Sequence, residues 1–177
     1  MKKAFQYKIK SKILTTVLIL LIPMAALMLM ESYTHVPWDL TPAIFLLNLL
    51  GYYLIYLLGT FVFGSVAGGY TFATLLFMCC GLANYCVVCF RSSPIVPWDI
   101  YSIRTAVSVA DNYNIDITGK LVAVIAGFLV LTVAGRMLPG KVKKVRIRLA
   151  ALVLSTFCLF GYVRALGSNA VIEAADL

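Results

Sequence analysis

The chain has 177 residues, of which 62% are hydrophobic and only 12% are charged. A water-soluble globular domain needs more polar surface than this, so the composition excludes that class and predicts an all-α integral membrane protein. The formal net charge of +8 could suggest nucleic-acid binding. However, the basic residues cluster at the ends of apolar runs, as topology determinants do, and we therefore expect no nucleic-acid partner.

Five apolar runs are long enough to cross about 30 Å of hydrocarbon as helices. They cover residues 13–30, 43–63, 70–90, 121–138 and 149–166. Pro23 lies inside the first run and predicts a kink, which membranes tolerate when a neighbour satisfies the freed carbonyl. The first run follows several lysines but is long and lacks a small-residue cleavage site, which favours a retained anchor over a cleaved signal peptide.

The distribution of Lys and Arg predicts the topology. The N-terminal residues 1–12 contain five lysines, and residues 136–148 contain six basic residues. Cytoplasmic loops carry an excess of Lys and Arg, so we expect both segments in the cytoplasm, with an uncharged hairpin over residues 64–69. Eleven of the 15 basic residues then lie inside. The domain prediction is a basic N-terminus, a five-helix transmembrane domain over residues 13–167 and an extracellular tail over residues 168–177, in the cell membrane.

A polar segment follows the third run and is too short to span a membrane. Pro94 and Pro97 break the preceding helix. Trp98 is expected at the level of the lipid headgroups, where tryptophan is enriched in membrane proteins. Asp99 is a good N-cap, and the apolar residues after it recur at helical spacing. The pattern predicts a short amphipathic helix over about residues 99–111, lying in the outer interface between the third and fourth spans.

Two arginines flank the start of this segment. Arg91 closes the third run, and Arg104 lies in the predicted interfacial helix. A guanidinium at headgroup depth can bind a lipid phosphate through two parallel hydrogen bonds. It can also simply mark the membrane edge by extending its charge toward water, and both interpretations stay open. The predicted lipid-headgroup and interface residues are Arg91, Pro94, Pro97, Trp98, Asp99 and Arg104.

Three polar residues lie inside apolar runs. Asn48 and Asn84 predict interhelical hydrogen bonds, each worth about 0.6 kcal/mol. Arg164 lies deeper in the last span than a topology charge would, and intramembrane charges usually find a partner inside the bundle. Asp99 and Glu31 are its candidate partners on the same side, and the sequence does not choose between them.

The number and spacing of the cysteine and histidine residues do not predict a catalytic or metal site. All five cysteines lie within the apolar runs. Cys86 and Cys89 have CxxC spacing, but no histidine and no second pair accompany them, and buried thiols behave as small hydrophobes. His35 is the only histidine, which is too few for a zinc site. We therefore expect no metal ligand, no cofactor and no catalytic residue in this chain.

Residues 84–114 resemble part of the membrane domain of the lipoteichoic acid synthase family, which are sulfatase-fold phosphoglycerol transferases of Gram-positive bacteria. In that family the third transmembrane helix ends in a pattern N-Y-x-x-x-x-F-R-x-x-P-I-x-P-W-D-L, followed by T-A-x-x-V-A-x-N-Y. The matching positions here are Asn84, Tyr85, Phe90, Arg91, Pro94, Ile95, Pro97, Trp98, Asp99 and Ile100, then Thr105, Ala106, Val109, Ala110, Asn112 and Tyr113.

The resemblance implies a function. In the family, five spans precede an extracellular sulfatase-like domain, in which a nucleophilic threonine and a manganese ion transfer glycerol phosphate from phosphatidylglycerol. The sequence to Leu177 contains no counterpart of that domain. Manganese is therefore expected only in the sulfatase-like domain and not in residues 1–177. The implied role is a non-catalytic anchor that presents lipid headgroups, with membrane lipids such as phosphatidylglycerol and a sulfatase-like domain, in cis or in trans, as partners. Two alternatives are a stand-alone regulatory protein that pairs with a full-length relative and a small transporter.

Overall fold

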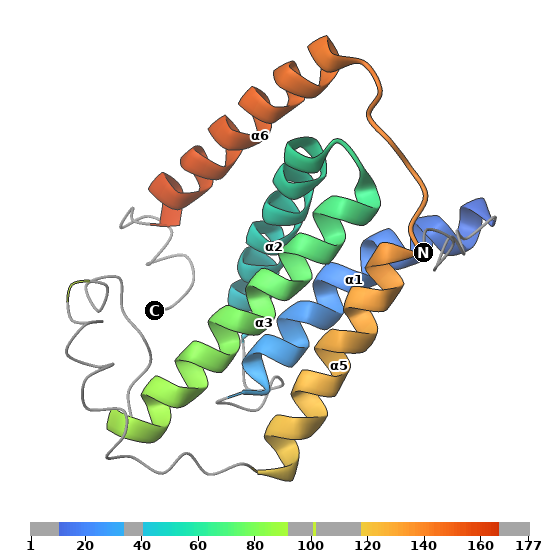
Figure 1. Cartoon of the computed structure of the whole chain (residues 1–177). Helices are drawn as coiled ribbons and strands as arrows, with labels where there is room; N and C mark the ends of the chain where they lie inside the picture. The colour runs from blue at the N-terminus through green and yellow to red at the C-terminus, as the bar shows by residue number, and fades with distance from the viewer. Residues whose placement is uncertain (1–10, 34–40, 92–100, 102–117, 167–177) are drawn as a thin grey trace.

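The protein is described by a computed structural model that covers residues 11–33, 41–91, 101 and 118–166. These residues form five long helices, and the only strand-like pairing among them is one isolated bridge. The helices are α1 (Lys12–Glu31), α2 (Pro42–Phe63), α3 (Val66–Arg91), α5 (Gly119–Arg136) and α6 (Val145–Leu166) (Figure 1). All five are long and apolar enough to cross a membrane. For the described residues, the prediction of an all-α protein with five such helices is confirmed.

Two helices begin a full turn earlier than the apolar runs predicted. The α3 helix begins at Val66 rather than residue 70, and α6 begins at Val145 rather than residue 149. The predicted hairpin over residues 64–69 therefore shrinks to Gly64 and Ser65. Its other glycines, Gly68 and Gly69, are helical, and Gly69 packs directly on the backbone of α2.

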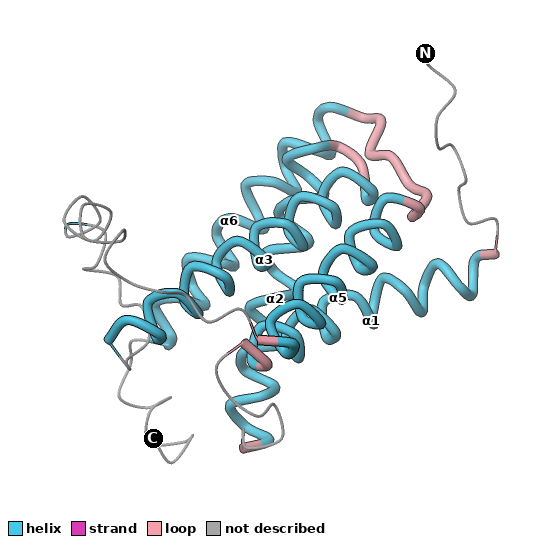
Figure 2. The backbone as a smooth tube through the Cα atoms, turned by 60° about the horizontal axis from the view of Figure 1, so that its bottom comes forward, coloured by secondary structure: helices cyan, strands magenta, loops and turns pink. Residues whose placement is uncertain are grey.

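The helices α1, α2, α3 and α5 pack together, with α3 touching each of the other three (Figures 1 and 2). Aromatic rings fill the contacts between them. Tyr52 of α2 stacks on Phe77 of α3 with ring centroids 3.9 Å apart, and the fully buried Tyr56 shares a 2.8 Å hydrogen bond with Thr74. The α6 helix packs on α2 alone, and its single buried residue is Ser155.

Glycines allow the helices to approach closely, as small residues do in membrane bundles. A β-carbon at Gly69 would overlap the backbone of Gly59 and Thr60, so α2 and α3 touch backbone to backbone at this crossing. A β-carbon at Gly51 would lie 2.8 Å from the Tyr162 hydroxyl oxygen. That hydroxyl donates to the carbonyl of Leu47 at 2.9 Å, which fixes the far end of α6 on α2.

Pro23 lies inside α1 and has no N–H to donate to the carbonyl of Ile19, four residues earlier. The hydroxyl of Tyr70 on α3 donates to that carbonyl at 3.0 Å. The next carbonyl, that of Leu20, accepts the hydroxyl of Tyr53 on α2 at 2.6 Å. The sequence predicted that a neighbour must satisfy the carbonyl freed by Pro23, and the structure identifies the donor as Tyr70.

This pairing gives a testable coupling. We expect Tyr70→Phe to lower the free energy of unfolding by about 1 kcal/mol, because it leaves the Ile19 carbonyl without a donor. In a Pro23→Ala background the same change should cost much less, because residue 23 then supplies the N–H. A double-mutant cycle measured by unfolding in mixed micelles checks this. An equal cost in both backgrounds would contradict the pairing.

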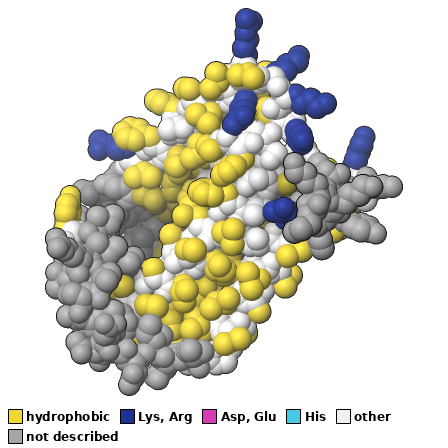
Figure 3. Space-filling view, in the orientation of Figure 1, with side chains coloured by type: hydrophobic (Ala, Val, Ile, Leu, Met, Phe, Trp, Pro, Cys, Tyr) yellow, Lys and Arg dark blue, Asp and Glu magenta, His cyan; other side chains and the backbone are white. Residues whose placement is uncertain are grey.

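The outer surface of the helices is apolar. Large hydrophobic side chains such as Val130 and Phe157 are strongly exposed, and apolar atoms cover much of the face seen in Figure 3. Contiguous apolar surface of this extent is unusual for a soluble monomer. It matches the surface that a helical bundle would present to hydrocarbon.

Candidate functional site

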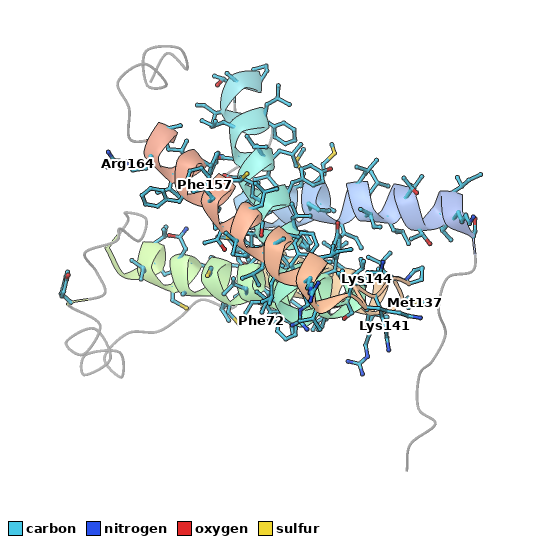
Figure 4. The ribbon with its side chains drawn as sticks, turned by 90° about the horizontal axis from the view of Figure 1, so that it is seen from above. Phe72, Met137, Lys141, Lys144, Phe157 and Arg164 are labelled. Carbon is cyan, nitrogen blue, oxygen red and sulfur yellow. The ribbon has the colours of Figure 1, made fainter. Side chains whose placement is uncertain are left out.

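One end of the bundle gathers most of its positive charge, and we call it the basic end. Here the α2–α3 turn lies beside the loop of residues 137–144, because the N–H of Val66 donates to Gly140 at 3.2 Å and that of Val142 donates to Gly64 at 2.9 Å. The N-terminus of α1 points the same way, since the carbonyl of Ile19 in α1 accepts a hydrogen bond from the hydroxyl of Tyr70 near the start of α3. The described cations at the basic end are Lys12, Arg136, Lys141, Lys143, Lys144, Arg146 and Arg148 (Figures 3 and 4).

Arg148, at the basic end, joins the start of α6 to the end of α2. Its Nε donates to the carbonyl of Phe61 at 2.7 Å, and its Nη2 donates to the carbonyl of Val62. These carbonyls belong to the last turn of α2, where no intrahelical donor remains. A cation at this position also complements the helix dipole. The sequence suggested only a topology role for Arg148, because its partners lie 86 and 87 residues away.

The opposite end of the bundle, which we call the Arg91 end, contains one residue of the predicted headgroup site, Arg91. Arg91 is the last residue of α3. Pro94, Pro97, Trp98, Asp99 and Arg104 lie outside the described residues, as does the predicted helix over residues 99–111 apart from Tyr101. The Tyr101 side chain is 91% exposed. The structure therefore places the point at which the third long helix ends but leaves the headgroup site itself a prediction.

An aromatic cluster supports the helices near the Arg91 end. The ring of Tyr33, just after α1, stacks on Phe128 of α5 at 5.9 Å and lies 6.4 Å from the ring of Tyr85 on α3. Gly81 of α3 makes room for the Tyr33 ring. Burial, together with the nearby Cys79, raises the pKa of the Tyr33 phenol above its ordinary value. Sequence analysis did not identify this cluster, because its members come from three separate segments.

The three predicted intramembrane polar residues lie on three different helices. Asn48 is half-buried on α2, Asn84 is half-buried on α3, and Arg164 is exposed in the last turn of α6. Figure 4 shows Arg164 at the end of α6. Glu31, one of its two candidate partners, forms no ion pair with it in the described part of the chain. Asp99, the other candidate, lies outside that part.

The cysteines are distributed along helix surfaces. All five are free thiols, and four of them are exposed, with Cys86 half-buried. Within residues 11–33, 41–91, 101 and 118–166, no group of three or more His, Cys, Asp or Glu side chains could hold a metal ion. The described cysteine side chains therefore lie mostly on the exposed surface of α3 and α6.

Comparisons of the chain with protein-family models, with curated proteins and with solved structures gave no match.

Proposed function

We propose that this chain is a multi-pass protein of the cell membrane that anchors and presents lipid headgroups to a phosphoglycerol transferase domain similar to that of lipoteichoic acid synthases. The observation that supports this most is the combination of five long apolar helices with a basic end. Lys and Arg are enriched in the cytoplasmic loops of membrane proteins. The basic end, with the N-terminus, is therefore assigned to the cytoplasm, and the Arg91 end to the outer face.

The composition of the bundle interior favours an anchor over a transporter. Among the described residues, the buried polar side chains are Thr60, Thr74 and Ser155, and no charged side chain is buried. Transport paths are usually lined by ionisable groups or interrupted helices. The described helices instead pack through aromatic rings and glycines, as a rigid support would.

The headgroup role depends on the sequence around Arg91. The resemblance of residues 84–114 to the lipoteichoic acid synthase family supports phosphatidylglycerol as the lipid and a sulfatase-like extracellular domain, in cis or in trans, as the partner. On this proposal Arg91 and Arg104 hold the phosphate while Pro94, Pro97, Trp98 and Asp99 shape the outer interface. Transfer of glycerol phosphate, with its threonine and manganese, belongs to that partner domain.

Arg91→Ala tests the headgroup role. We expect the variant to retain severalfold less phosphatidylglycerol than the wild type, because a bidentate charge-assisted contact is lost. The measurement is native mass spectrometry of the purified full chain, titrated with phosphatidylglycerol and with phosphatidylcholine. Equal retention by both proteins would remove Arg91 from the site.

The control for this experiment tests whether the wild-type chain is embedded in the membrane. An embedded chain stays in the membrane pellet at alkaline pH, and a cysteine placed at Lys143, in a cysteine-free background, is labelled only from the cytoplasmic side. Release at alkaline pH, or labelling of residue 143 from outside, would overturn the anchor proposal before any lipid is added.

A further inference from the structure

An open groove of about 490 Å³ lies at the basic end, between the start of α3 and the end of α5. Most of its lining is apolar and comes from Phe63, Ala67, Phe72 and Leu75, whereas Arg136 supplies its one charged side chain. The rings of Phe63 and Phe72 are 5.1 Å apart, and each side chain is about half exposed. Such exposure of two aromatic side chains beside a guanidinium gives the groove an apolar part and a cationic part.

The lining residues are arranged along the helix axis. Gly68, Thr71, Phe72 and Leu75 recur at the three- and four-residue spacing of a single helix face, so the apolar lining extends from the basic end toward the middle of α3. Arg136 lines the groove from the end of α5, whose neighbouring Gly135 packs on Tyr70 of α3; we call this side of the groove its mouth. A ligand seated here would place an anionic group at Arg136 and an apolar chain along Phe72 and Leu75.

Among the described residues, no acidic side chain balances the positive charge around the mouth of the groove. Seven described cations lie at the basic end, whereas the only acidic side chain that the structure describes, Glu31, ends α1 at the opposite end. The sequence contains no Asp or Glu before Glu31, between Asp39 and Asp99, or between Asp116 and Glu173. Each Lys or Arg near an anionic membrane surface contributes attraction for its lipids.

We propose that this groove is a binding site for an anionic phospholipid of the cytoplasmic leaflet, with the phosphate at Arg136 and an acyl chain along Phe72 and Leu75. The site is separate from the headgroup site at the Arg91 end and lies in the other leaflet. It rests on the proposed function only in requiring that the chain is embedded in a membrane. A lipid occupying the groove would bridge α3 and α5 and hold the loop of residues 137–144 at the membrane surface.

Arg136→Gln is the first test, using the full chain and native mass spectrometry with phosphatidylglycerol and phosphatidylcholine as probes. We expect the preference for phosphatidylglycerol over phosphatidylcholine to fall roughly fivefold, as loss of one membrane-surface cation allows. Lys143→Gln is the matched control, because it removes the same charge from the adjoining loop of residues 137–144 without lining the groove. Its effect should be less than about twofold.

Ala67→Phe is the second test, because it fills the apolar part of the groove and leaves every charge in place. We expect it to reduce phosphatidylglycerol binding while size-exclusion behaviour and helix content remain those of the wild type. Soluble glycerol phosphate, added as a competitor, should displace little of the bound lipid, since it lacks the acyl chain.

Three results would overturn the groove proposal. Equal effects of Arg136→Gln and Lys143→Gln would mean a diffuse surface field, and an inert Ala67→Phe would mean that the apolar lining is not used. Full displacement by glycerol phosphate would mean a site for a free phosphate. Failure of the anchor proposal is distinguishable, because the wild type itself would then leave the membrane at alkaline pH.

Discussion

Gly69→Ala should destabilise the protein by about 2 kcal/mol, a large cost for the addition of one methyl group. The added β-carbon would overlap the backbone of Gly59 and Thr60. Backbone atoms cannot rotate away as side chains do, so α2 and α3 must separate, and overpacking of this kind costs about 1–3 kcal/mol. The higher helix propensity of alanine offsets at most about 1 kcal/mol. Thermal unfolding in detergent, followed by circular dichroism, measures the change.

Gly161→Ala is the matched control, because it makes the same chemical change inside another helix. A β-carbon at Gly161 would meet no neighbouring atom within 4 Å, so we expect no loss of stability and a small gain from helix propensity. Gly59→Ala should cost less than Gly69→Ala, since its β-carbon would lie 3.1 Å from the Gly69 oxygen. If Gly69→Ala were as harmless as Gly161→Ala, the close crossing of α2 and α3 would be wrong.

The positions of the long helices could be predicted because hydrophobic runs report directly on membrane-length helices. Their starts were harder to predict. Gly68 and Gly69 suggested a loop because glycine lowers helix propensity, but both are helical, and the close contact with α2 leaves no room for a β-carbon at residue 69. Residues 145–148 were placed in the basic cytoplasmic segment before the last span, and they form the first turn of α6. The backbone contact of Gly69 and the hydrogen bonds of Arg148 with α2 both involve residues far away in the sequence, which the local pattern does not report.

Side-chain partners were the part that the sequence could not specify. Pro23 predicted that a carbonyl would need an external donor, yet nothing local pointed to Tyr70, 51 residues away from Ile19. The Tyr33 cluster and the groove at Arg136 also combine separate segments. For the predicted headgroup site the structure adds only the end of α3 at Arg91, so Pro94, Pro97, Trp98, Asp99 and Arg104 rest on the sequence alone.

Arg148→Leu should be the second strongly destabilising change, by about 2–4 kcal/mol. It removes two charge-assisted hydrogen bonds to the carbonyls of Phe61 and Val62, each worth about 1.5–3 kcal/mol, and leaves both acceptors unpaired. It also leaves Tyr162, which donates to Leu47, to join α6 to α2 without the help of Arg148. The same unfolding measurement in detergent applies.

Two comparisons separate the hydrogen bonds of Arg148 from its charge. Arg146→Leu removes a cation from the same turn of α6, where the side chain is exposed, and should change stability by no more than about 0.5 kcal/mol. Arg148→Lys keeps the charge but lacks the planar fork that reaches two carbonyls, so its cost should be intermediate. If Arg148→Lys matched the wild type, the charge alone would stabilise the end of α2. If Arg148→Leu matched Arg146→Leu, Arg148 would be only a topology charge, and another contact would have to hold the start of α6 on α2.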